Sequence, residues 1–437
     1  MTIHLNPDQN RILNWRINSG GVAGIVGPPG CGKTTTGSAL AVKMIADGYA
    51  NRVLLVAFTN SSANEFCREL SIILGPIASK FLCVRSGYPA GIDTSLPIPF
   101  SNNIEEIRTK KIVICTTLSL WRLSGVIKFD NMIIDEAGIE KLQDILSPFT
   151  FGINQMAVHL LKNKISYAVN NIIELAANCG IVATVVGDPK QSRPIGLVDY
   201  DHSAIEYVLK YAKSDTLFTS HRLPDILSAL VNEFANYNGL KSAPDVALRR
   251  LDLNVSNLNP EFKKIIQPEE VITWVDFNGN EEMSGPSSWY NENEARICSR
   301  ICNELCKIAS NKSIAIVTRY TEQRRIISNY LRKLGLTNIR VLTTTGALGT
   351  QADIVLFSIV RNNPERQVGA VGSLQDLNVA ISRSKEKLFI IGSFDMMMNG
   401  WSKVPTLIEK GRKNISRRLA YLIDHKYGQV IQAPSIY

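Results

Sequence analysis

The stretch GVAGIVGPPGCGKTTTGSAL, residues 21–40, decides the fold. A short apolar run is followed by a glycine-rich turn and then by a helix-forming segment, which is the order of a phosphate-binding loop. The turn GPPGCGKT, residues 27–34, matches the pattern G-x-x-x-x-G-K-[S/T]. Glycines there permit backbone angles and close approaches that a Cβ would prevent, and the amides of the turn and of the helix N-terminus favour an anion. We therefore expect a nucleoside triphosphate site made by Gly27, Gly30, Gly32, Lys33, Thr34 and Thr35.

Within this loop the two side chains that follow Gly32 have separate expected roles. Lys33 should reach the β- and γ-phosphates, and Thr34 should offer a hydroxyl to Mg²⁺. The expected ligands are therefore ATP and Mg²⁺.

Two later apolar runs end in polar residues suited to the same chemistry. The segment NMIIDEAG, residues 131–138, places Asp135 to hold Mg²⁺ and Glu136 to polarise an attacking water. Alone, such an acidic pair could cap a helix, but it lies downstream of a phosphate loop. The segment VVGDPKQ, residues 185–191, ends in Gln191, an uncharged side chain able to sense a terminal phosphate, although alone the segment could be an ordinary turn.

Composition sets the class of protein. The chain has 437 residues, enough for two or three domains, and a formal net charge of +9, which weakly favours a polyanionic partner. No apolar run approaches the roughly 20 residues of a membrane-spanning helix, and the N-terminus does not resemble a secretion signal. We expect a soluble, intracellular protein of the cytoplasm or nucleus, with a viral origin also compatible.

Apolar runs alternate with helical segments in two series, which predicts two tandem, doubly wound α/β domains. The predicted domains are residues 1–215, with the phosphate loop, and residues 216–437, with a basic C-terminal extension. A helical insert is expected at residues 141–178, and residues 87–104 and 278–288 are expected to be loops. The predicted strands are residues 22–26, 53–58, 112–116, 132–134 and 181–186, then 271–275, 314–318, 340–343, 354–359 and 388–392.

Three of the eight cysteines recur every four residues and so share one helical face. Cys298, Cys302 and Cys306 could be soft-metal ligands, but no fourth ligand stands nearby. Small buried residues on a core-facing helix are the favoured interpretation.

Taken in order, the motifs resemble a superfamily 1 helicase. The branch that is most similar moves 5′ to 3′ and includes the nonsense-mediated-decay helicase and the nidovirus helicases. The resemblance extends from residue 5 to about residue 395, and its most specific parts are the order of the motifs and the last of them. The motifs are LNPDQ (5–9), GPPGCGKT (27–34), AFTNSSANEF (57–66), ICTTLSL (114–120), IIDEAG (133–138), VVGDPKQ (185–191), SHRLP (220–224), IVTRYTEQR (316–324), TTTGALGTQAD (343–353) and LNVAISRSK (377–385).

The resemblance implies two RecA-like domains that hydrolyse ATP together. It implies that Gln9 recognises the adenine edge, that Tyr320 lies near the base, and that Gln191 senses the γ-phosphate. Arg222, Arg324 and Arg383 match arginines that act on the phosphates from the second domain. Such an arginine can be worth roughly 10³–10⁵ in rate, so domain closure would assemble the catalytic site.

The resemblance also implies contacts to a single-stranded nucleic acid. The matched positions carry hydroxyls and amides, which suit backbone phosphates without recognising bases, although ordinary turn hydrogen bonds are the alternative at each. These positions are Thr59 and Asn60, Thr116 and Thr117, and Thr343 and Thr344.

Several positions depart from this pattern. Leu348 stands where a glutamine is usual, Gln351 where an acidic residue is usual, and Arg319 where this branch often has proline. We expect that no zinc domain, stalk or small β-barrel precedes the core, and the insert at 141–178 could be a wedge, a protein-binding site or decoration.

Three functions are compatible with this sequence. The first is an ATP-dependent helicase that translocates 5′ to 3′ on RNA or DNA, most simply as a monomer. The second is an ATP-driven clamp that remodels nucleoprotein without unwinding, as the altered motif at 343–353 suggests. The third, a phosphate-loop switch that gates a protein partner, would not need the strand contacts near Thr59 and Thr116.

Overall fold

The computed structural model describes residues 4–89, 91–142, 144–146, 173, 176, 180–191, 203–285, 288–402 and 415–434. They form two compact units. The first comprises Met1–Pro189 and Arg193–Phe218, and the second comprises Lys190–Ser192 and Thr219–Tyr437. The short segment that carries Gln191 therefore packs with the second unit, although the sequence around it belongs to the first. The predicted helical insert lies almost wholly outside the described residues.

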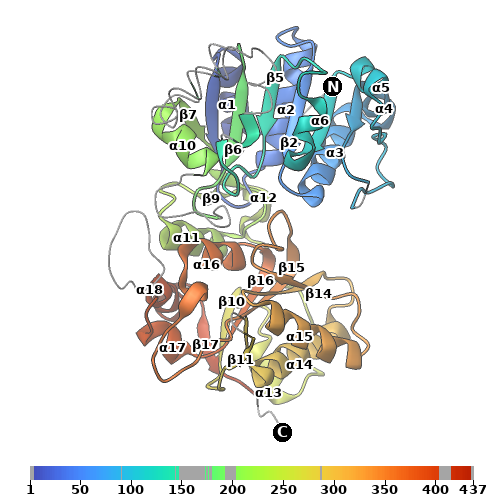
Figure 1. The fold of residues 1–437 in the computed structure, drawn as a ribbon. Coiled ribbons are helices and arrows are strands. Elements are labelled where there is room, and N and C mark those ends of the chain that lie inside the picture. The colour runs from blue at the N-terminus through green and yellow to red at the C-terminus, as the bar shows by residue number, and fades with distance from the viewer. Residues whose placement is uncertain are drawn as a thin grey trace. The chain divides into compact units, whose positions relative to one another are not determined.

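The first unit contains a parallel sheet of seven described strands in the order β3-β4-β2-β5-β6-β1-β7 (Figure 1). Its inner strands are short, β-branched and buried, as expected of a parallel sheet covered on both faces. Because the strands run in parallel, their carboxyl ends meet at one edge, where ligands bind in such folds. The strands are β1 (Val22–Val26), β2 (Val53–Ala57), β3 (Cys83–Arg85), β4 (Ile112–Thr116), β5 (Asn131–Ile134), β6 (Ala183–Gly187) and β7 (Ser214–Thr216).

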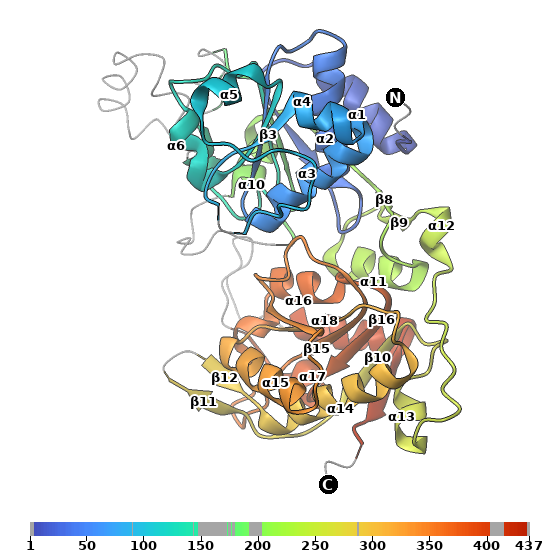
Figure 2. The same cartoon turned by 90° about the vertical axis from the view of Figure 1, so that its right-hand side faces the viewer.

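Helices cover both faces of this sheet. Figure 2 shows α1, α2 and α3 on one face, and α6 and α10 on the other. The apolar side chains of α6 and α10 join the core beneath β5 and β6. The helices are α1 (Pro7–Ile17), α2 (Lys33–Ala46), α3 (Asn60–Leu74), α4 (Pro76–Leu82), α5 (Ile104–Thr109), α6 (Leu120–Leu123) and α10 (Ala204–Tyr211), with a 3-10 turn, η1 (Thr117–Ser119).

The second unit contains a parallel sheet of six described strands, in the order β14-β13-β15-β16-β10-β17. A hairpin, β11 with β12, and a small parallel pair, β8 with β9, lie outside this sheet. The strands are β8 (Thr219–Ser220), β9 (Lys241–Ser242), β10 (Ile272–Asp276), β11 (Glu282–Ser284), β12 (Ser288–Tyr290), β13 (Ile314–Thr318), β14 (Arg340–Thr343), β15 (Ala352–Ser358), β16 (Ser384–Ile391) and β17 (Gln429–Gln432).

Helices also cover both faces of the second sheet (Figure 1). α14 and α15 pack together over one core, while α11, α16 and α18 group on the other side. The helices are α11 (Asp225–Ala235), α12 (Pro244–Ala247), α13 (Pro260–Ile265), α14 (Glu292–Ile308), α15 (Thr321–Lys333), α16 (Leu374–Ile381), α17 (Phe394–Asn399) and α18 (Ile415–Leu422), with a 3-10 turn, η3 (Gly369–Gly372), and a π-helical turn, η4 (Ile423–Tyr427).

The predicted class, two RecA-like α/β units, is confirmed. The predicted and observed bounds of β1, β4, β13 and β14 coincide, and the other predicted strands are shifted by one to four residues. The strands β3, β7, β17 and the small strands outside the main sheets were not predicted, because they are short or mostly polar.

Two expectations about the second unit are corrected by the structure. Residues 278–288, expected to be a loop, include β11 and the first residue of β12, which together form a hairpin. The C-terminal segment is not merely an extension, because β17 pairs in parallel with β10 and forms an edge of the sheet. Within the described part of the chain, no helix is both long and apolar enough to cross a membrane.

The cysteine stripe of α14 is part of the core. Cys298 and Cys302 are fully buried among aliphatic side chains, and Cys306 lies at the margin of the same cluster. Burial raises the pKa of all three thiols, so they are held in the neutral form rather than as metal-binding thiolates. Among the described residues no cluster of three or more His, Cys, Asp or Glu side chains could hold a metal on its own.

Candidate functional site

The phosphate loop joins β1 to α2 at the carboxyl edge of the first sheet. Its first amide, Gly27 N, donates to the carbonyl of Gly187 at the end of β6 over 3.0 Å. Gly32 has φ of +72°, which a residue with a Cβ rarely adopts, and it is the N-cap of α2 without a side-chain cap. A Cβ on Gly27 would lie 2.4 Å from Cγ of Lys33. These glycines let the loop curl around the Lys33 side chain, whose ammonium donates to the carbonyl of Gly27 over 2.6 Å.

Thr34 and Asp135 meet in the first unit although 101 residues separate them. The Thr34 hydroxyl donates to Oδ2 of Asp135 over 2.7 Å, and Asp135 is only 5% exposed. Two oxygen donors at this distance suit Mg²⁺, which prefers oxygen ligands and is commonly bound by one or two protein groups together with substrate phosphates. The residues present therefore fit the expected metal.

Glu136 is held in an unusual backbone conformation beside this pair. Its φ is +57°, in the left-handed region that non-glycine residues seldom adopt. The conformation is stabilised by two hydrogen bonds, from the Glu136 amide to Oδ1 of Asp135 over 2.8 Å and from the Ala137 amide to the carbonyl of Val186 over 3.1 Å. Strained backbone of this kind clusters at functional sites, and here it turns the chain directly after the predicted Mg²⁺ ligand, Asp135.

Two further predicted contacts lie against the loop. A Cβ on Gly32 would lie 2.6 Å from Nε2 of Gln9, so the side-chain amide of Gln9 is packed on the phosphate loop. Gln9 is 4% exposed, and its Oε1 accepts from the Asn6 amide in a capping box of α1. Thr35 hydrogen-bonds Glu69, and burial of this carboxyl raises its pKa.

The predicted strand contacts of the first unit lie at the carboxyl ends of β2 and β4. Thr59 caps α3 by accepting from the Ser62 amide over 3.1 Å, and the Thr116 hydroxyl is 3.2 Å from that of Ser119. Asn60 Oδ1 accepts from Arg85 over 2.7 Å. Each of these three side chains therefore takes part in local structure, and their contacts to nucleic acid stay a prediction.

Sequence reasoning missed two ionisable groups at this edge, of which Arg85 is buried and Glu140 is partly buried. Arg85, at the end of β3, is 1% exposed and connects the ends of β2 and β3 through Asn60. Burial raises the pKa of the Glu140 carboxyl, which lies near the predicted strand contact Thr117, to about 7. Neither residue belongs to the motifs, and only the fold brings them to the predicted strand contacts.

Two of the three predicted phosphate arginines converge within the second unit. Arg222 donates from Nε to Oε1 of Gln351 over 3.0 Å and from Nη1 to the carbonyl of Ser382 over 3.2 Å. Arg383, which is 3% exposed, donates to the Ser382 hydroxyl over 3.0 Å and to the carbonyl of Val379 over 3.0 Å. Both guanidinium groups are thus oriented on Ser382, at the C-terminal end of α16.

The third arginine, Arg324, and the predicted phosphate sensor, Gln191, have different surroundings. Arg324, in the first turn of α15, is exposed, and its guanidinium makes no hydrogen bond or ion pair within the described residues. Gln191 is 8% exposed, and its Nε2 is buried without a partner among those residues. Next to it, the carbonyl of Lys190 accepts from Asn378 of α16 over 2.7 Å. The sensor segment is therefore attached to the helix that precedes Arg383.

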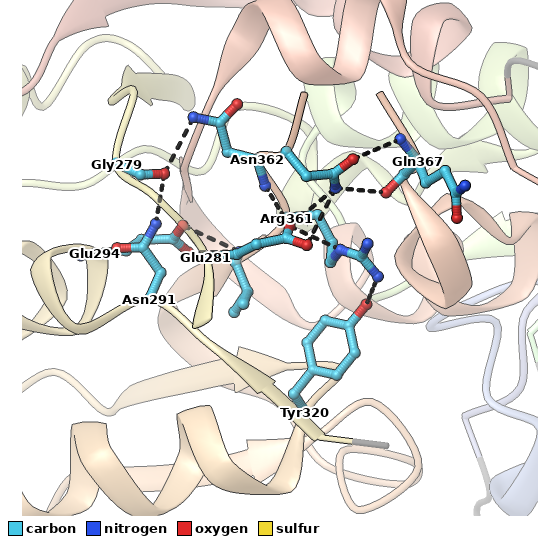
Figure 3. A network of polar contacts seen from close by, with 10 residues as sticks. Gly279, Glu281, Asn291, Glu294, Tyr320, Arg361, Asn362 and Gln367 are labelled. Carbon is cyan, nitrogen blue, oxygen red and sulfur yellow. Dashed lines mark hydrogen bonds and ion pairs between the residues drawn. The ribbon is translucent and has the colours of Figure 1, made fainter. Parts of the chain in front are cut away.

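Tyr320, expected near the nucleotide base, is covered by its own unit. Its ring is 6% exposed, and its hydroxyl accepts from Arg361 over 3.5 Å (Figure 3). Arg361 also forms a buried ion pair with Glu281, with 2.9 Å between Nε and Oε2. Burial raises the pKa of the Tyr320 hydroxyl. A contact between Tyr320 and a base stays a prediction, and it requires that the ring become exposed.

A buried carboxyl supports the chain beyond β15. Glu294, in α14, is 1% exposed, accepts from the Ser358 hydroxyl over 2.6 Å and accepts from the Val360 amide over 3.0 Å. Val360 has φ of +75°, a strained conformation for a β-branched residue. Burial raises the pKa of Glu294 to about 8. This carboxyl therefore fixes the turn that leads into Arg361.

The last predicted strand contacts follow β14. Thr343 Oγ1 accepts from the Gly346 amide over 3.1 Å, and Thr344 is 2% exposed. The Thr344 hydroxyl donates to Oδ1 of Asp376 over 2.5 Å. Direct contact of the Thr344 hydroxyl with a strand stays a prediction, which would require this inner hydrogen bond to break.

Comparisons with known proteins identify the family. Two models, each described as an AAA domain, match residues 4–147 and 200–395. RNA helicase Mov10l1 of Mus musculus is 25% identical over 413 residues, 84% of this chain and 32% of the relative. The DNA replication ATP-dependent helicase/nuclease DNA2 of Xenopus laevis is 24% identical over 427 residues, 89% of this chain and 37% of the relative.

The two tandem domain matches, the ordered motifs and these relatives all indicate the same family. The chain belongs to the superfamily 1 helicases, in the branch of the nonsense-decay helicase. This superfamily 1 chain spans about a third of the length of the relatives described above. A solved arterivirus nonstructural protein 10 (helicase) in complex with DNA matches 88% of the chain and 64% of its own, at 14% identity and a TM-score of 0.48.

Proposed function

We propose that this superfamily 1 chain is an ATP-dependent helicase that translocates from 5′ to 3′ on single-stranded nucleic acid. The observation that carries the proposal is the 2.7 Å contact between Thr34 and Asp135, with the strained Glu136 next in the chain. Two motifs far apart in sequence thereby make one oxygen-lined site behind a phosphate loop. The direction of movement rests on the family likeness alone.

The residues of the first unit have distinct roles in this proposal. Lys33 binds the β- and γ-phosphates, and the loop amides and the α2 N-terminus bind the remaining oxygens. Thr34 and Asp135 would hold Mg²⁺, which when bound would neutralise phosphate charge. Glu136 orients and polarises the attacking water, and Gln9 contacts the adenine edge.

The second unit supplies cations to the transition state. Arg222 and Arg383 are already oriented on Ser382, and Arg324 is exposed at the start of α15. Gln191 responds to the terminal phosphate, and its segment is attached to α16 through Asn378. We propose that hydrolysis and product release thereby alter the second unit's hold on the strand, which converts turnover into stepping.

The test is steady-state ATP hydrolysis with and without matched single-stranded DNA and RNA, followed by unwinding of duplexes with 5′ or 3′ tails. The proposal expects strong stimulation by one or both strands and opening of the 5′-tailed duplex. Absence of any stimulation would overturn it in favour of a switch that acts on a protein partner.

One observation favours a second candidate, a strand-clamping ATPase that remodels nucleoprotein without unwinding. Leu348, in place of the usual glutamine, is apolar and 8% exposed, so this position offers no polar side-chain contact. Stimulation by single strands without opening of either tailed duplex would support this candidate.

A further inference from the structure

The end of β13 carries an arginine that the motifs do not explain. Nε of Arg319 donates to Oδ2 of Asp376 over 3.1 Å, and the two side chains are 38% and 21% exposed. The guanidinium makes no other hydrogen bond within the described residues, so its two NH₂ groups remain available on a side chain that is partly open to solvent.

Asp376 holds Arg319 beside the turn that follows β14. Its Oδ1 accepts from the Thr344 hydroxyl over 2.5 Å, and its Oδ2 also accepts from the Ser373 hydroxyl over 2.8 Å. The Thr344 amide donates to the carbonyl of Thr318 over 2.9 Å, next to Arg319 in the chain. One carboxylate of α16 therefore connects the ends of β13 and β14.

The surface made by these residues suits a phosphate group. Thr345 and Gly346, the next residues of the turn, are exposed, and a guanidinium fork matches phosphate oxygens in a planar, two-pronged geometry. Three side chains already donate to Asp376, which reduces the repulsion between its carboxylate and a phosphate. The Thr344 hydroxyl is buried and donates to Asp376, whereas the guanidinium of Arg319 is partly exposed to solvent.

We propose that Arg319 binds a backbone phosphate of the single-stranded nucleic acid, and that Asp376 is the positioning residue that orients it. The inference rests on the proposed function, since it assumes that a strand crosses the carboxyl edge of the second sheet. It assigns Thr344 to holding Asp376 rather than to touching the strand.

The experiment measures equilibrium binding of labelled single-stranded DNA and RNA as salt is raised from about 50 to 200 mM. For single strands, each neutralised phosphate contributes about −0.7 to the slope of log K against log salt. Arg319→Ala should weaken binding several-fold and make the slope less steep by about 0.7. Arg319→Lys should retain much of the slope but not the full affinity, because the ammonium lacks the fork.

The matched control is Arg332→Ala, which removes the same charge from an exposed arginine of α15 whose guanidinium contacts only Asn329 among described side chains. The control should leave both affinity and slope close to those of the unmodified chain. Asp376→Asn should weaken binding when Arg319 is present. It should add little to the effect of Arg319→Ala, because both changes remove the same contact between Arg319 and the strand.

The outcomes separate this inference from the proposed function. If the unmodified chain binds strands and Arg319→Ala binds them with the same affinity and slope, the inference is wrong and the proposed function stands. If the unmodified chain neither binds strands nor is stimulated by them, both fail. A purely structural role would lower the thermal midpoint of Arg319→Ala without altering the slope, and Arg319→Gln repeats the measurement should the alanine variant not fold.

Discussion

The phosphate loop of the first unit and the arginine region of the second unit are built in different ways. The loop is one continuous segment whose glycines, lysine and threonines are neighbours in sequence. The arginine region draws Arg222, Gln351 and Ser382 from positions up to 160 residues apart. The chemistry of a local segment can therefore be predicted from its sequence pattern, whereas a site that the fold assembles is recognised only in the three-dimensional structure.

The largest expected effect tests the local site. Lys33→Ala should abolish nucleotide-dependent activity, because it removes the cation that we propose binds the β- and γ-phosphates. ATP binding and steady-state hydrolysis measure this loss. Lys43→Ala, which removes an exposed lysine paired with Asp47 in the same helix, is the control and should leave both unchanged. Substantial hydrolysis by Lys33→Ala would contradict the assignment of the loop.

The next largest effect is expected in the arginine region of the second unit. Arg383→Ala should slow hydrolysis by roughly 10³–10⁵, as expected for an arginine that stabilises the transition state, with little loss of ATP affinity. Single-turnover hydrolysis and nucleotide titration separate the two quantities. Normal turnover by this variant would show that the second unit does not complete the site.

Glu136 tests whether the strained turn of the first unit is catalytic. Glu136→Gln retains the size of the side chain and removes its charge, so hydrolysis should fall by about 10²–10⁴ while ATP binding is retained. The measurement is again hydrolysis against binding. A variant that hydrolyses ATP as fast as the unmodified chain would leave Glu136 with a structural role only.

The smallest expected effect concerns Glu294, the buried carboxyl that supports the turn after β15 in the second unit. The folded pKa of Glu294, about 8, lies above the ordinary value of 4.5, so between these values the folded state binds more protons than the unfolded state. This carboxyl therefore makes stability fall as pH rises through the window, by at most about 1.4 kcal/mol per pH unit. Glu294→Gln should flatten the dependence of the thermal midpoint on pH, and an unchanged profile would contradict it.

The same contrast explains how much could be predicted from sequence. The apolar runs of β1 and β4 and the motif at Gly27–Thr34 specify strand, turn and helix locally, so their bounds were correct. The short strands β3 and β7 have too few residues for a period-two pattern to be distinguished from a turn. The contacts of Asp376 and Gln351 could not be predicted, because they depend on which strands become neighbours.

Some predicted site residues have local roles that the motif pattern did not show. Asn60 accepts a hydrogen bond from Arg85, Thr344 donates one to Asp376, and Tyr320 accepts one from Arg361. Hydroxyl, amide and phenol groups serve a hydrogen-bond network as readily as a ligand, and only burial distinguishes the two uses.

The edge strand β17 has a practical consequence for anyone shortening this chain. Its backbone covers one side of β10, and Gly428 before it approaches so closely that a Cβ there would lie 2.6 Å from the carbonyl of Ile272. Truncation before Gln429 would leave the backbone amides and carbonyls on that side of β10 unpaired. An exposed sheet edge of this kind promotes aggregation between strands of different molecules. Purification handles and fusion partners at that end therefore belong beyond Gln432, behind a spacer.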